Sequence, residues 1–252
     1  MLLHPTLQSL RGMKLNGMAQ ALQEQLELGH GKELEFEERF ALLVDREVIH
    51  RQNKGFDRRL RNAKLKHNAS LEDIDYKYPR KLEGSLVRSL ASCDWVREHH
   101  NLIITGPTGV GKTFVASALA NQACRIGFTA LYAKCSRLLQ ELVLAKSDGR
   151  YLRLLDGLTK TDVLILDDWG LEPPNADQRR VLLELLDDRY DKRSTIFTSQ
   201  FPTDLWYENL ADPTLADAIL DRILHNAYRL ELAGESLRKS KRKLTREEVT
   251  GA

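Results

Sequence analysis

A glycine-rich run between residues 106 and 113 has the residue types and spacing best suited to chemistry. It consists of Gly106, Pro107, Thr108, Gly109, Val110, Gly111, Lys112 and Thr113. An apolar stretch typical of a strand precedes it (102–105), and a helix-forming stretch follows (114–124). Glycines let successive backbone N–H groups curl around an anion, and the N-terminus of the next helix adds partial positive charge. The pattern predicts a phosphate-binding loop, with Lys112 on nucleotide phosphates and the Thr113 hydroxyl as a Mg²⁺ ligand.

Two adjacent carboxylates, Asp167 and Asp168, follow a second apolar stretch, residues 163–166. An apolar strand that ends in acidic residues is a Walker B pattern. We expect Asp167 to hold Mg²⁺ through water, and Asp168 to orient or deprotonate the attacking water. The alternative is that Asp168 is an ordinary N-cap or loop carboxylate.

Gln200 follows another apolar stretch, residues 195–199. A polar residue at the end of the strand beside Walker B is placed to contact the terminal phosphate or the lytic water. Gln200 is the best candidate for this role, with Thr198 and Ser199 behind it. The competing interpretation is that Gln200 caps the turn that follows the strand.

Arginines are candidates for stabilising the charge on a transferred phosphoryl group. Arg222 lies late in the helix that precedes the last predicted strand, and Arg238 lies just after that strand. Arg189 and Arg193 compete with Arg222 for its role, and the sequence does not choose between them.

Five apolar stretches alternate with amphipathic helical stretches from residue 91 onwards, and this alternation predicts the fold. Buried strands separated by helices indicate an α/β fold with a five-stranded parallel sheet flanked by helices. Ligands of such sheets bind at the carboxyl ends of the strands, where the glycine-rich run and Asp167 both fall. The predicted strands are residues 102–105, 128–133, 163–167, 195–199 and 228–232.

The N-terminal quarter has a different character. Residues 1–66 show helical periodicity, and the part from residue 51 carries basic residues against a single acidic one, Asp57. We interpret it as a small all-helical domain for DNA or partner binding. Its contacts with the DNA backbone are expected to come from Arg51, Lys54, Arg58, Arg59 and Arg61. A solvated helix with a charge bias is the alternative. The other predicted parts are a linker (67–90), an ATPase domain (91–236) and a basic C-terminal tail (237–252).

Composition excludes several classes of protein. The chain has 252 residues with a net charge of +2, and no apolar run approaches the length of a membrane span. We see no signal peptide, and three widely spaced cysteines suit a reducing compartment, so we expect a cytoplasmic protein without a membrane partner. Cys93 with His99 and His100 lacks a second ligand pair and predicts a surface cluster rather than a metal site.

Four stretches together resemble the AAA+ superfamily, in the initiator and helicase-loader clade that includes DnaA and DnaC. Within this clade the chain is most similar to the IstB-type helper ATPases of insertion-sequence transposition. The Walker motifs identify only the superfamily, whereas the N-terminal and C-terminal stretches are the specific ones. The stretches are residues 10–18, 106–113, 164–170 and 221–238.

This resemblance implies ATP and Mg²⁺ as cofactors and a role for each matching residue. Lys112 and Thr113 match the phosphate and Mg²⁺ ligands, and Gln200 matches the sensor 1 position. Arg222 matches the arginine finger that acts on the ATP of a neighbouring subunit, and Arg238 matches sensor 2. Asp168 departs from the family because related ATPases usually carry Glu there, which leaves the rate of hydrolysis open.

The clade also carries a helical insertion after its second strand and a helical lid after its last strand. Residues 136–159 fit the insertion, which in relatives drives assembly and lines the DNA path, although a longer surface helix is the plain alternative. Few residues follow 232, so we expect a truncated lid. The basic residues of the insertion are Arg137, Lys146, Arg150 and Arg153.

The resemblance thus implies a DNA-stimulated ATPase that assembles as a homo-oligomer on double-stranded DNA and recruits or stimulates a cognate transposase. The first alternative is a DnaC-like replicative helicase loader, which shares the core motifs. A small-molecule kinase is disfavoured by the paired carboxylates, the two arginines and the basic helix. A DNA-binding scaffold that binds ATP without turnover stays open because of Asp168.

Overall fold

The computed structural model describes residues 3–27 and 33–237, which form two compact units. The first unit ends at Arg58 and the second begins at Arg59, so both include a part of helix α3 (Phe36–Ala63). The functional boundaries expected after residues 66, 90 and 236 stay predictions. Almost all of the predicted basic tail lies outside the described residues.

The first unit is helical, as predicted. It contains α1 (Leu3–Gly12), α2 (Asn16–Glu27) and the first part of α3. The buried carboxylate of Glu47 in α3 accepts the backbone N–H groups of Gly17 (2.7 Å) and Met18 (3.1 Å) at the start of α2. Because the first N–H groups of a helix lack partners within it, this side chain both caps α2 and ties it to α3.

The second unit contains a five-stranded parallel sheet in the order β2-β3-β4-β1-β5. All five predicted strands are confirmed, with ends that differ by at most two residues. One correction concerns β3, which continues through Asp168 and Trp169 with an irregular register after Leu166. The strands are β1 (Asn101–Thr105), β2 (Ala130–Lys134), β3 (Val163–Trp169), β4 (Ser194–Ser199) and β5 (Ala227–Glu231).

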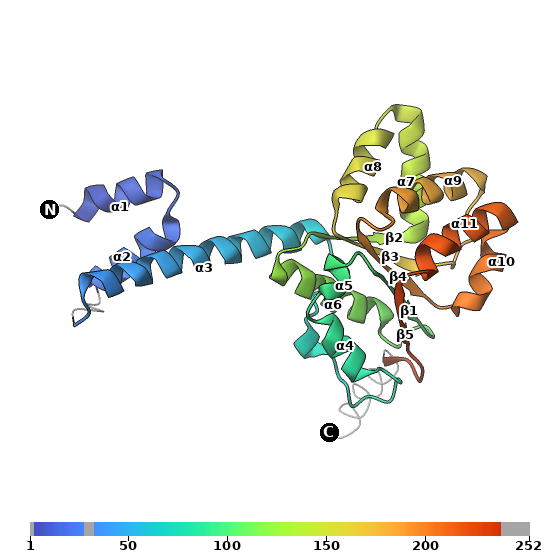
Figure 1. The fold of residues 1–252 in the computed structure, drawn as a ribbon, viewed down its shortest axis with the longest axis horizontal. Helices are drawn as coiled ribbons and strands as arrows, with labels where there is room; N and C mark the ends of the chain where they lie inside the picture. The colour runs from blue at the N-terminus through green and yellow to red at the C-terminus, as the bar shows by residue number, and fades with distance from the viewer. Residues whose placement is uncertain (1–2, 28–32, 238–252) are drawn as a thin grey trace, which may run out of the picture. The chain divides into compact units, whose positions relative to one another are not determined.

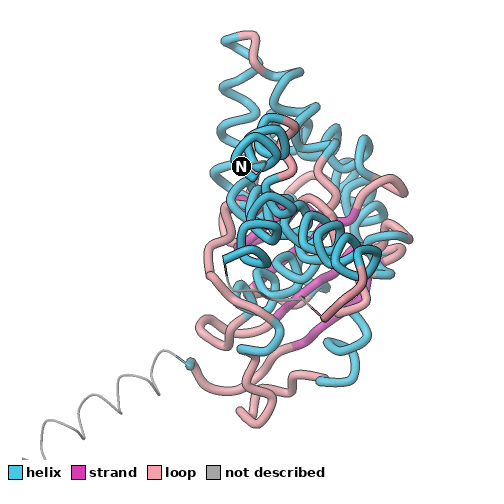
Figure 2. The backbone as a smooth tube through the Cα atoms, turned by 90° about the vertical axis from the view of Figure 1, so that its left-hand side faces the viewer, coloured by secondary structure: helices cyan, strands magenta, loops and turns pink. Residues whose placement is uncertain are grey.

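Helices cover both faces of this sheet (Figures 1 and 2). Helix α6 packs on one face, and the other carries a cluster in which Ile103, Leu164 and Phe197 meet apolar side chains of the opposite helices. Alternate strand residues point to opposite faces, and both faces are covered, which is why the middle residues of β1, β3 and β4 are apolar on both sides. The covering helices are α6 (Lys112–Ile126), α7 (Cys135–Asp148), α8 (Tyr151–Lys160), α9 (Ala176–Arg189), α10 (Trp206–Leu210) and α11 (Pro213–Leu224).

The hairpin of α7 and α8 occupies the predicted helical insertion, residues 136–159. After β5, residues 232–236 contain no helix, and the truncated lid stays a prediction because residues 238–252 lie outside the described chain. The remaining short helices are η1 (Leu71–Asp73), α4 (Gly84–Leu90), α5 (Asp94–Arg97) and η2 (Thr203–Leu205).

Two findings concern the whole of the described chain, residues 3–27 and 33–237. None of its helices is long and apolar enough to cross a membrane. No group of three or more histidines, cysteines and carboxylates is arranged to hold a metal ion there. The cysteines require a correction: all three are buried free thiols, so the fully buried Cys93 does not form the expected surface cluster with His99 and His100.

Candidate nucleotide-binding site

The glycine-rich loop lies between the carboxyl end of β1 and the start of α6. Lys112 is the first residue of α6, and its ammonium donates to the carbonyls of Gly106 (2.6 Å) and Pro107 (2.9 Å). The Lys112 side chain therefore lies across the loop, where we expect the phosphates to bind. The helix N-terminus points its free N–H groups at the same place, which suits an anion.

Segment 232–237, which sequence reasoning did not connect with the loop, packs against it. Gly109 has a φ of 88°, and a Cβ added there would lie 2.0 Å from Ser236 Oγ. The N–H of Leu237 donates to the carbonyl of Gly109 (3.0 Å), and that of Leu232 to the carbonyl of Thr105 (2.8 Å). Loop and segment thus form one layer. No local pattern in 232–237 marks this contact, which depends on β5 lying beside β1.

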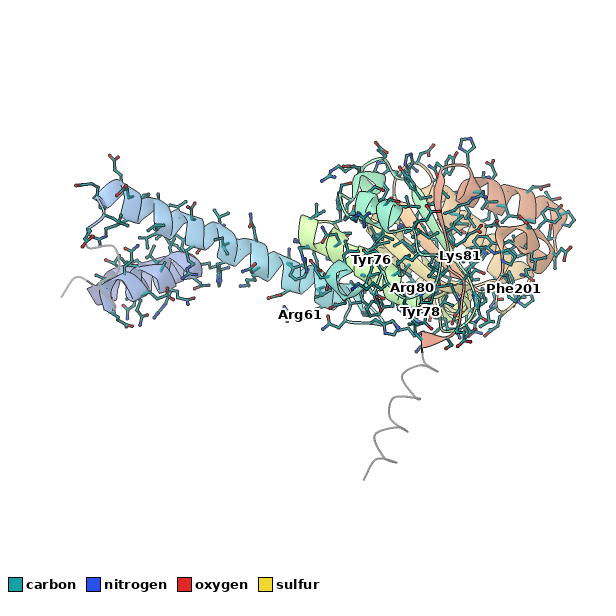
Figure 3. The ribbon with its side chains drawn as sticks, turned by 90° about the horizontal axis from the view of Figure 1, so that it is seen from below. Arg61, Tyr76, Tyr78, Arg80, Lys81 and Phe201 are labelled. Atoms are coloured by element: carbon teal, nitrogen blue, oxygen red, sulfur yellow. The ribbon has the colours of Figure 1, made fainter. Side chains whose placement is uncertain are left out.

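Arg80 also supports the loop, together with segment 232–237, and was also missed. Its guanidinium is buried and donates to the carbonyls of Val110 (3.2 Å) and Asp75 (3.0 Å). Burial lowers the pKa of Arg80, against the opposing effect of the nearby Asp75. Figure 3 shows Arg80 beside Tyr76 and Tyr78, from the stretch before α4. Part of the predicted linker is therefore a wall of the site.

Asp167 is the centre of the site and is fully buried. Its Oδ1 accepts the hydroxyls of Thr113 (2.7 Å) and Thr198. Its Oδ2 accepts the hydroxyl of Tyr132 (2.7 Å) and pairs with the Lys66 ammonium (3.3 Å). The structure thus brings the two predicted Mg²⁺ ligands together, with Tyr132 and Lys66 as partners that the sequence did not indicate.

These donors determine the charge state of Asp167. Burial by itself would raise its pKa, but the hydrogen bonds from Thr198, Tyr132 and Thr113, with the charge of Lys66, outweigh burial. The pKa of Asp167 therefore lies below its ordinary value, and the carboxylate is ionised at neutral pH. An ionised carboxylate beside a threonine hydroxyl is an all-oxygen donor set of the kind Mg²⁺ prefers, so these residues fit the metal that the family implies.

Asp168 occupies a backbone irregularity of β3. Its φ is 59°, in the left-handed region that residues with a Cβ seldom adopt, and its N–H donates to Thr198 Oγ1 (3.2 Å). Its carboxylate lies 3.6 Å from the ammonium of Lys134, at the end of β2. Asp168 is thus a strand residue rather than the loop carboxylate of the alternative interpretation, and a neighbouring cation balances its charge.

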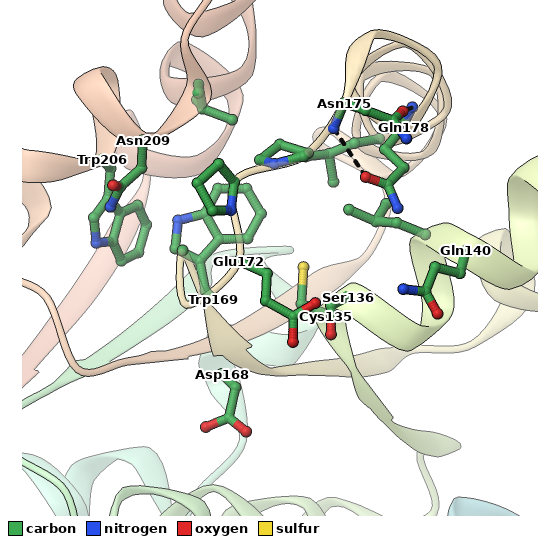
Figure 4. A pocket seen from close by; sticks show the side chains of 16 residues that line it. Cys135, Ser136, Gln140, Asp168, Trp169, Glu172, Asn175, Gln178, Trp206 and Asn209 are labelled. Carbon is green, nitrogen blue, oxygen red and sulfur yellow. Dashed lines mark hydrogen bonds between the residues drawn. The ribbon is translucent and has the colours of Figure 1, made fainter.

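A cavity of about 300 Å³ adjoins Asp168. Trp169 and Trp206 form its apolar wall, and Gln140, Gln178 and Asn209 contribute amides. The Asp168 carboxylate points away from the tryptophan rings (Figure 4). The cavity was not predicted, because its walls come from three separate stretches of sequence.

Gln200 meets the glycine-rich loop directly. Its Oε1 accepts the hydroxyl of Thr108 (2.6 Å), which places the end of β4 beside the loop. The hydroxyl of Thr198 donates to Asp167, and that of Ser199 donates to the carbonyl of Trp169 (2.8 Å). The position suits a contact with a bound phosphate, which stays a prediction.

The candidate arginines lie in different surroundings. Arg189 is fully buried and donates to the carbonyls of Leu158 and Thr161, and burial lowers its pKa to about 9. Such a side chain holds the core together and has no access to a nucleotide of another subunit. Arg222 is partly exposed on α11 and is bound by Asp187 of α9. Arg238 lies outside the described residues.

Arg193, the other rival, is engaged near the surface. Its Nη1 donates to the carbonyl of Lys192 (2.8 Å), and its Nε lies 3.6 Å from the carboxylate of Asp162. The contact with Asp162 ties it to the residue before β3. Arg193 and Arg222 are thus both partly exposed and paired with a carboxylate, and the role of Arg222 stays a prediction.

The predicted DNA-binding residues are not equally available. Arg59 donates to the carbonyl of Cys124 (2.8 Å), and Arg51 pairs with Glu47 (2.7 Å). In the insertion, Lys146 pairs with Glu184 (3.4 Å) and Arg150 with Asp148 (2.6 Å). Arg59 is half-buried, whereas the other members of the set are exposed, including the paired Arg51, Lys146 and Arg150.

The strand order, the glycine-rich loop at β1 and the acidic end of β3 define a P-loop ATP-binding protein of the AAA+ superfamily. The model of the IstB-like ATP binding protein family matches residues 8–245. An insertion sequence ATP-binding protein of Sinorhizobium fredii is 49% identical over 96% of this chain and 99% of its own length. Another, of the Pseudomonas fluorescens insertion sequence IS1162, is 50% identical over 81% of this chain and 88% of its own. The chain belongs to the IstB-like ATP binding protein family.

Solved structures agree with this assignment at the level of the fold. The crystal structure of DnaI is similar with a TM-score of 0.57 and 28% identity, over 66% of this chain and 91% of that one. AMPPCP-bound DnaA from Aquifex aeolicus is similar with a TM-score of 0.55 and 18% identity, over 67% of this chain and 51% of that one. The predicted AAA+ fold is confirmed.

Proposed function

We propose that this protein is an ATPase that assembles on duplex target DNA, with ATP between neighbouring subunits, and recruits or stimulates the transposase of its insertion sequence. The observation that carries the proposal is the distribution of the candidate residues over the sheet. The P-loop, Asp167 and Gln200 gather at the carboxyl ends of the strands, whereas Arg222 lies at their amino ends. The relatives, which are named insertion sequence ATP-binding proteins, support the biological setting.

The residues at the carboxyl edge have complementary roles in this proposal. The loop N–H groups and Lys112 bind the phosphates of ATP, while Thr113 and Asp167 hold Mg²⁺, whose charge offsets that of the phosphates. Asp168 orients or deprotonates the attacking water, and Gln200 contacts the terminal phosphate. Lys112 has to exchange the carbonyls of Gly106 and Pro107 for phosphate oxygens when ATP binds.

Arg222 has to act on a neighbouring subunit for geometric reasons. Asn101, the first residue of β1, donates to the backbone carbonyl of Arg222 (3.0 Å), whereas the P-loop follows the last residue, Thr105. A strand rises by roughly 3.3 Å per residue, so the length of β1 separates Arg222 from its own loop by more than ten ångströms. Its guanidinium, now held by Asp187, therefore serves the ATP of the adjacent subunit, and ATP favours assembly.

The proposed DNA contact uses the exposed basic residues of α3 and of the α7–α8 hairpin. Arginine and lysine side chains without a fixed hydrogen-bonding frame contact phosphates rather than base edges. The affinity for duplex DNA is then weakly sequence-specific and decreases steeply with salt, since each neutralised phosphate releases counterions.

Size measurement of the protein with a duplex of about 50 base pairs tests the proposal, since a site of several helical turns accommodates several subunits. We expect a large complex with ATP and DNA together and none with either alone. Lys112→Ala, which removes the phosphate contact, should prevent this growth. Arg88→Ala changes a basic residue of α4 outside the site and is the control.

The outcome separates the proposal from its main alternative. Growth on DNA, followed by stimulation of the cognate transposase, supports the transposition helper. A protein that ignores DNA but co-purifies with a replicative helicase in an ATP-dependent manner is a helicase loader instead. A monomer that ignores both ATP and DNA contradicts the proposal.

A further inference from the structure

We propose that Lys66 is a displaceable counter-ion of Asp167, which neutralises the Walker B carboxylate until Mg²⁺ and ATP bind together. It is a positioning residue, because it acts through Asp167. The inference rests on the proposed Mg²⁺·ATP site and adds a competitor for its central ligand.

The first argument is a count of hydrogen-bonding positions. A carboxylate accepts at about four lone-pair sites, and all four sites of Asp167 have partners. Thr113 and Thr198 bind Oδ1, and Tyr132 and Lys66 bind Oδ2. Asp167 is fully buried, so there is no open side from which a metal ion or its water can approach. One of the four donors must leave.

The second argument identifies which donor leaves. Thr198 and Tyr132 belong to β4 and β2, which flank the strand of Asp167 on either side, and Thr113 is itself an expected Mg²⁺ ligand. Lys66 comes from the connection after α3, its side chain is 43% exposed, and its contact is the longest of the four at 3.3 Å. A lysine has many rotamers and is readily hydrated once released.

The third argument is electrostatic. Two cations on one carboxylate oxygen repel each other, and this repulsion is strong where burial lowers the effective dielectric constant. Mg²⁺ carries twice the charge of an ammonium and therefore prevails when nucleotide phosphates add further ligands. Without them, Lys66 keeps the buried charge of Asp167 paired, which avoids the cost of an unpaired buried carboxylate.

The backbone around Lys66 confines the change to its side chain. Ala63 at the end of α3 and Ala69 are both buried, and they fix the connection on either side of Lys66. The ammonium lies 5.9 Å from the centre of the Tyr132 ring, along whose face it can leave Asp167. We therefore expect the release to expose Lys66 without unfolding the connection.

Nucleotide affinity as a function of Mg²⁺ concentration provides the first test. With a fluorescent ATP analogue, Lys66→Met should shift the Mg²⁺ midpoint about fivefold lower, the value for a partly exposed ion pair worth about 1 kcal/mol. Lys66→Arg should restore the wild-type midpoint, and Lys64→Met, two residues earlier, should not change it. Binding in EDTA checks that the P-loop of each variant is folded.

Chemical labelling of lysines provides the second test and does not depend on a variant. Acylation of Lys66, measured by mass spectrometry, should rise when Mg²⁺ and ATPγS are added together. It should not rise with ATPγS in EDTA or with Mg²⁺ alone. Lys64 is the internal reference.

Several results would overturn the inference. An unchanged or higher Mg²⁺ midpoint in Lys66→Met would mean that Lys66 does not compete with the metal. Constant or reduced labelling of Lys66 with Mg²⁺ and ATPγS would mean that it stays on Asp167 or moves onto the nucleotide. A wild-type protein that binds no nucleotide at any Mg²⁺ concentration would instead remove the proposed function, and this inference with it.

Discussion

Asp168 and Asp167 are adjacent, yet the structure gives the two carboxylates different surroundings. Asp167 is fully buried among four donors, whereas the Asp168 side chain is 25% exposed beside Lys134 and a cavity. A buried, ionised carboxylate suits metal binding, and an accessible one suits the orientation or deprotonation of a water molecule. The backbone irregularity at Asp168 frees its side chain from the strict alternation of a strand.

This division of labour leads to a prediction for Asp168→Asn. The amide keeps the size of the side chain but cannot accept a proton, so ATP hydrolysis should fall by about 10²–10⁴-fold. Nucleotide affinity and ATP-dependent assembly should stay close to those of the wild type, because Asp167 and the P-loop are intact. Steady-state hydrolysis and fluorescent-nucleotide binding measure the two properties.

Asp156→Asn provides the matched control, since Asp156 is an exposed carboxylate of α8 that pairs with Lys160 of the same helix. It should hydrolyse ATP like the wild type. Undiminished hydrolysis in Asp168→Asn would argue that another group, with Gln200 the nearest candidate, orients the water.

The residue scale also shows what the sequence can predict about a site. The pairing of Thr113 with Asp167 was predictable, because a P-loop and a Walker B strand place known residue types at one sheet edge. The contacts of Tyr132 and Lys66 with Asp167 were not. Tyr132 reaches it only because β2 pairs with β3, and Lys66 only because the chain before the sheet returns to its edge. Such contacts depend on the tertiary fold and leave no local pattern.

At the scale of elements, the contact between α2 and α3 explains a stretch that carried the resemblance to IstB-type proteins. A Cβ added to Gly17 would lie 2.7 Å from the carbonyl oxygen of Arg46 and 2.8 Å from Cα of Glu47. Both atoms belong to the backbone of α3 and cannot move aside separately. The glycine therefore permits close helix packing, and Glu47 then reaches the start of α2.

We expect Gly17→Ala to destabilise this packing by about 1–3 kcal/mol, the usual cost of overfilling a tight contact. The lost hydrogen bonds from Gly17 and Met18 to Glu47 should add to the effect. Hydrogen–deuterium exchange of the full-length protein should show faster exchange in α2 and the first part of α3. Exchange in the sheet should not change.

Gly12→Ala is the control, because a Cβ added at Gly12 meets no atom within 4 Å. It should leave exchange in α2 unchanged and slightly slow exchange at the end of α1, since alanine favours a helix. Equal protection in the two variants would mean that the helices separate without cost and that Gly17 has another purpose.

Elements were predicted better than the contacts between them. Hydrophobic period and residue type located the strands. β1 and β3 contain continuous apolar runs because they are buried on both faces, whereas β5 is exposed at three of its five residues. The packing of 232–237 on the P-loop was not predicted, since it follows from the position of β5 at the edge of the sheet beside β1. The burial of Arg189 was missed for a similar reason. Sequence alone predicts that an arginine in a helix is exposed, because the carbonyl groups that bind it come from distant residues.

At the scale of the whole molecule, the separation of Arg222 from its own P-loop predicts a particular kind of assembly. In the proposed function, one surface of a subunit presents the nucleotide and a different surface presents Arg222, so we expect a heterologous contact that generates rings or helices. Each active site would then be divided between two subunits. A defect at Asp168 in one subunit and a defect at Arg222 in another should therefore compensate each other.

This division is tested by mixing Asp168→Asn, which should still bind ATP and assemble, with Arg222→Ala. Each variant alone should hydrolyse little ATP, the first because it lacks the group that activates water and the second because it lacks charge stabilisation, worth about 10³–10⁵-fold. In an equal mixture on DNA, about a quarter of the interfaces should join an intact Asp168 to an intact Arg222, as random head-to-tail contacts require. Hydrolysis should recover to a comparable fraction of the wild-type rate. Arg180→Ala, an exposed arginine of α9, controls for loss of surface charge, and a tag on one variant confirms that the subunits mix. Mixed assemblies without recovered hydrolysis would show that Arg222 does not act across the interface.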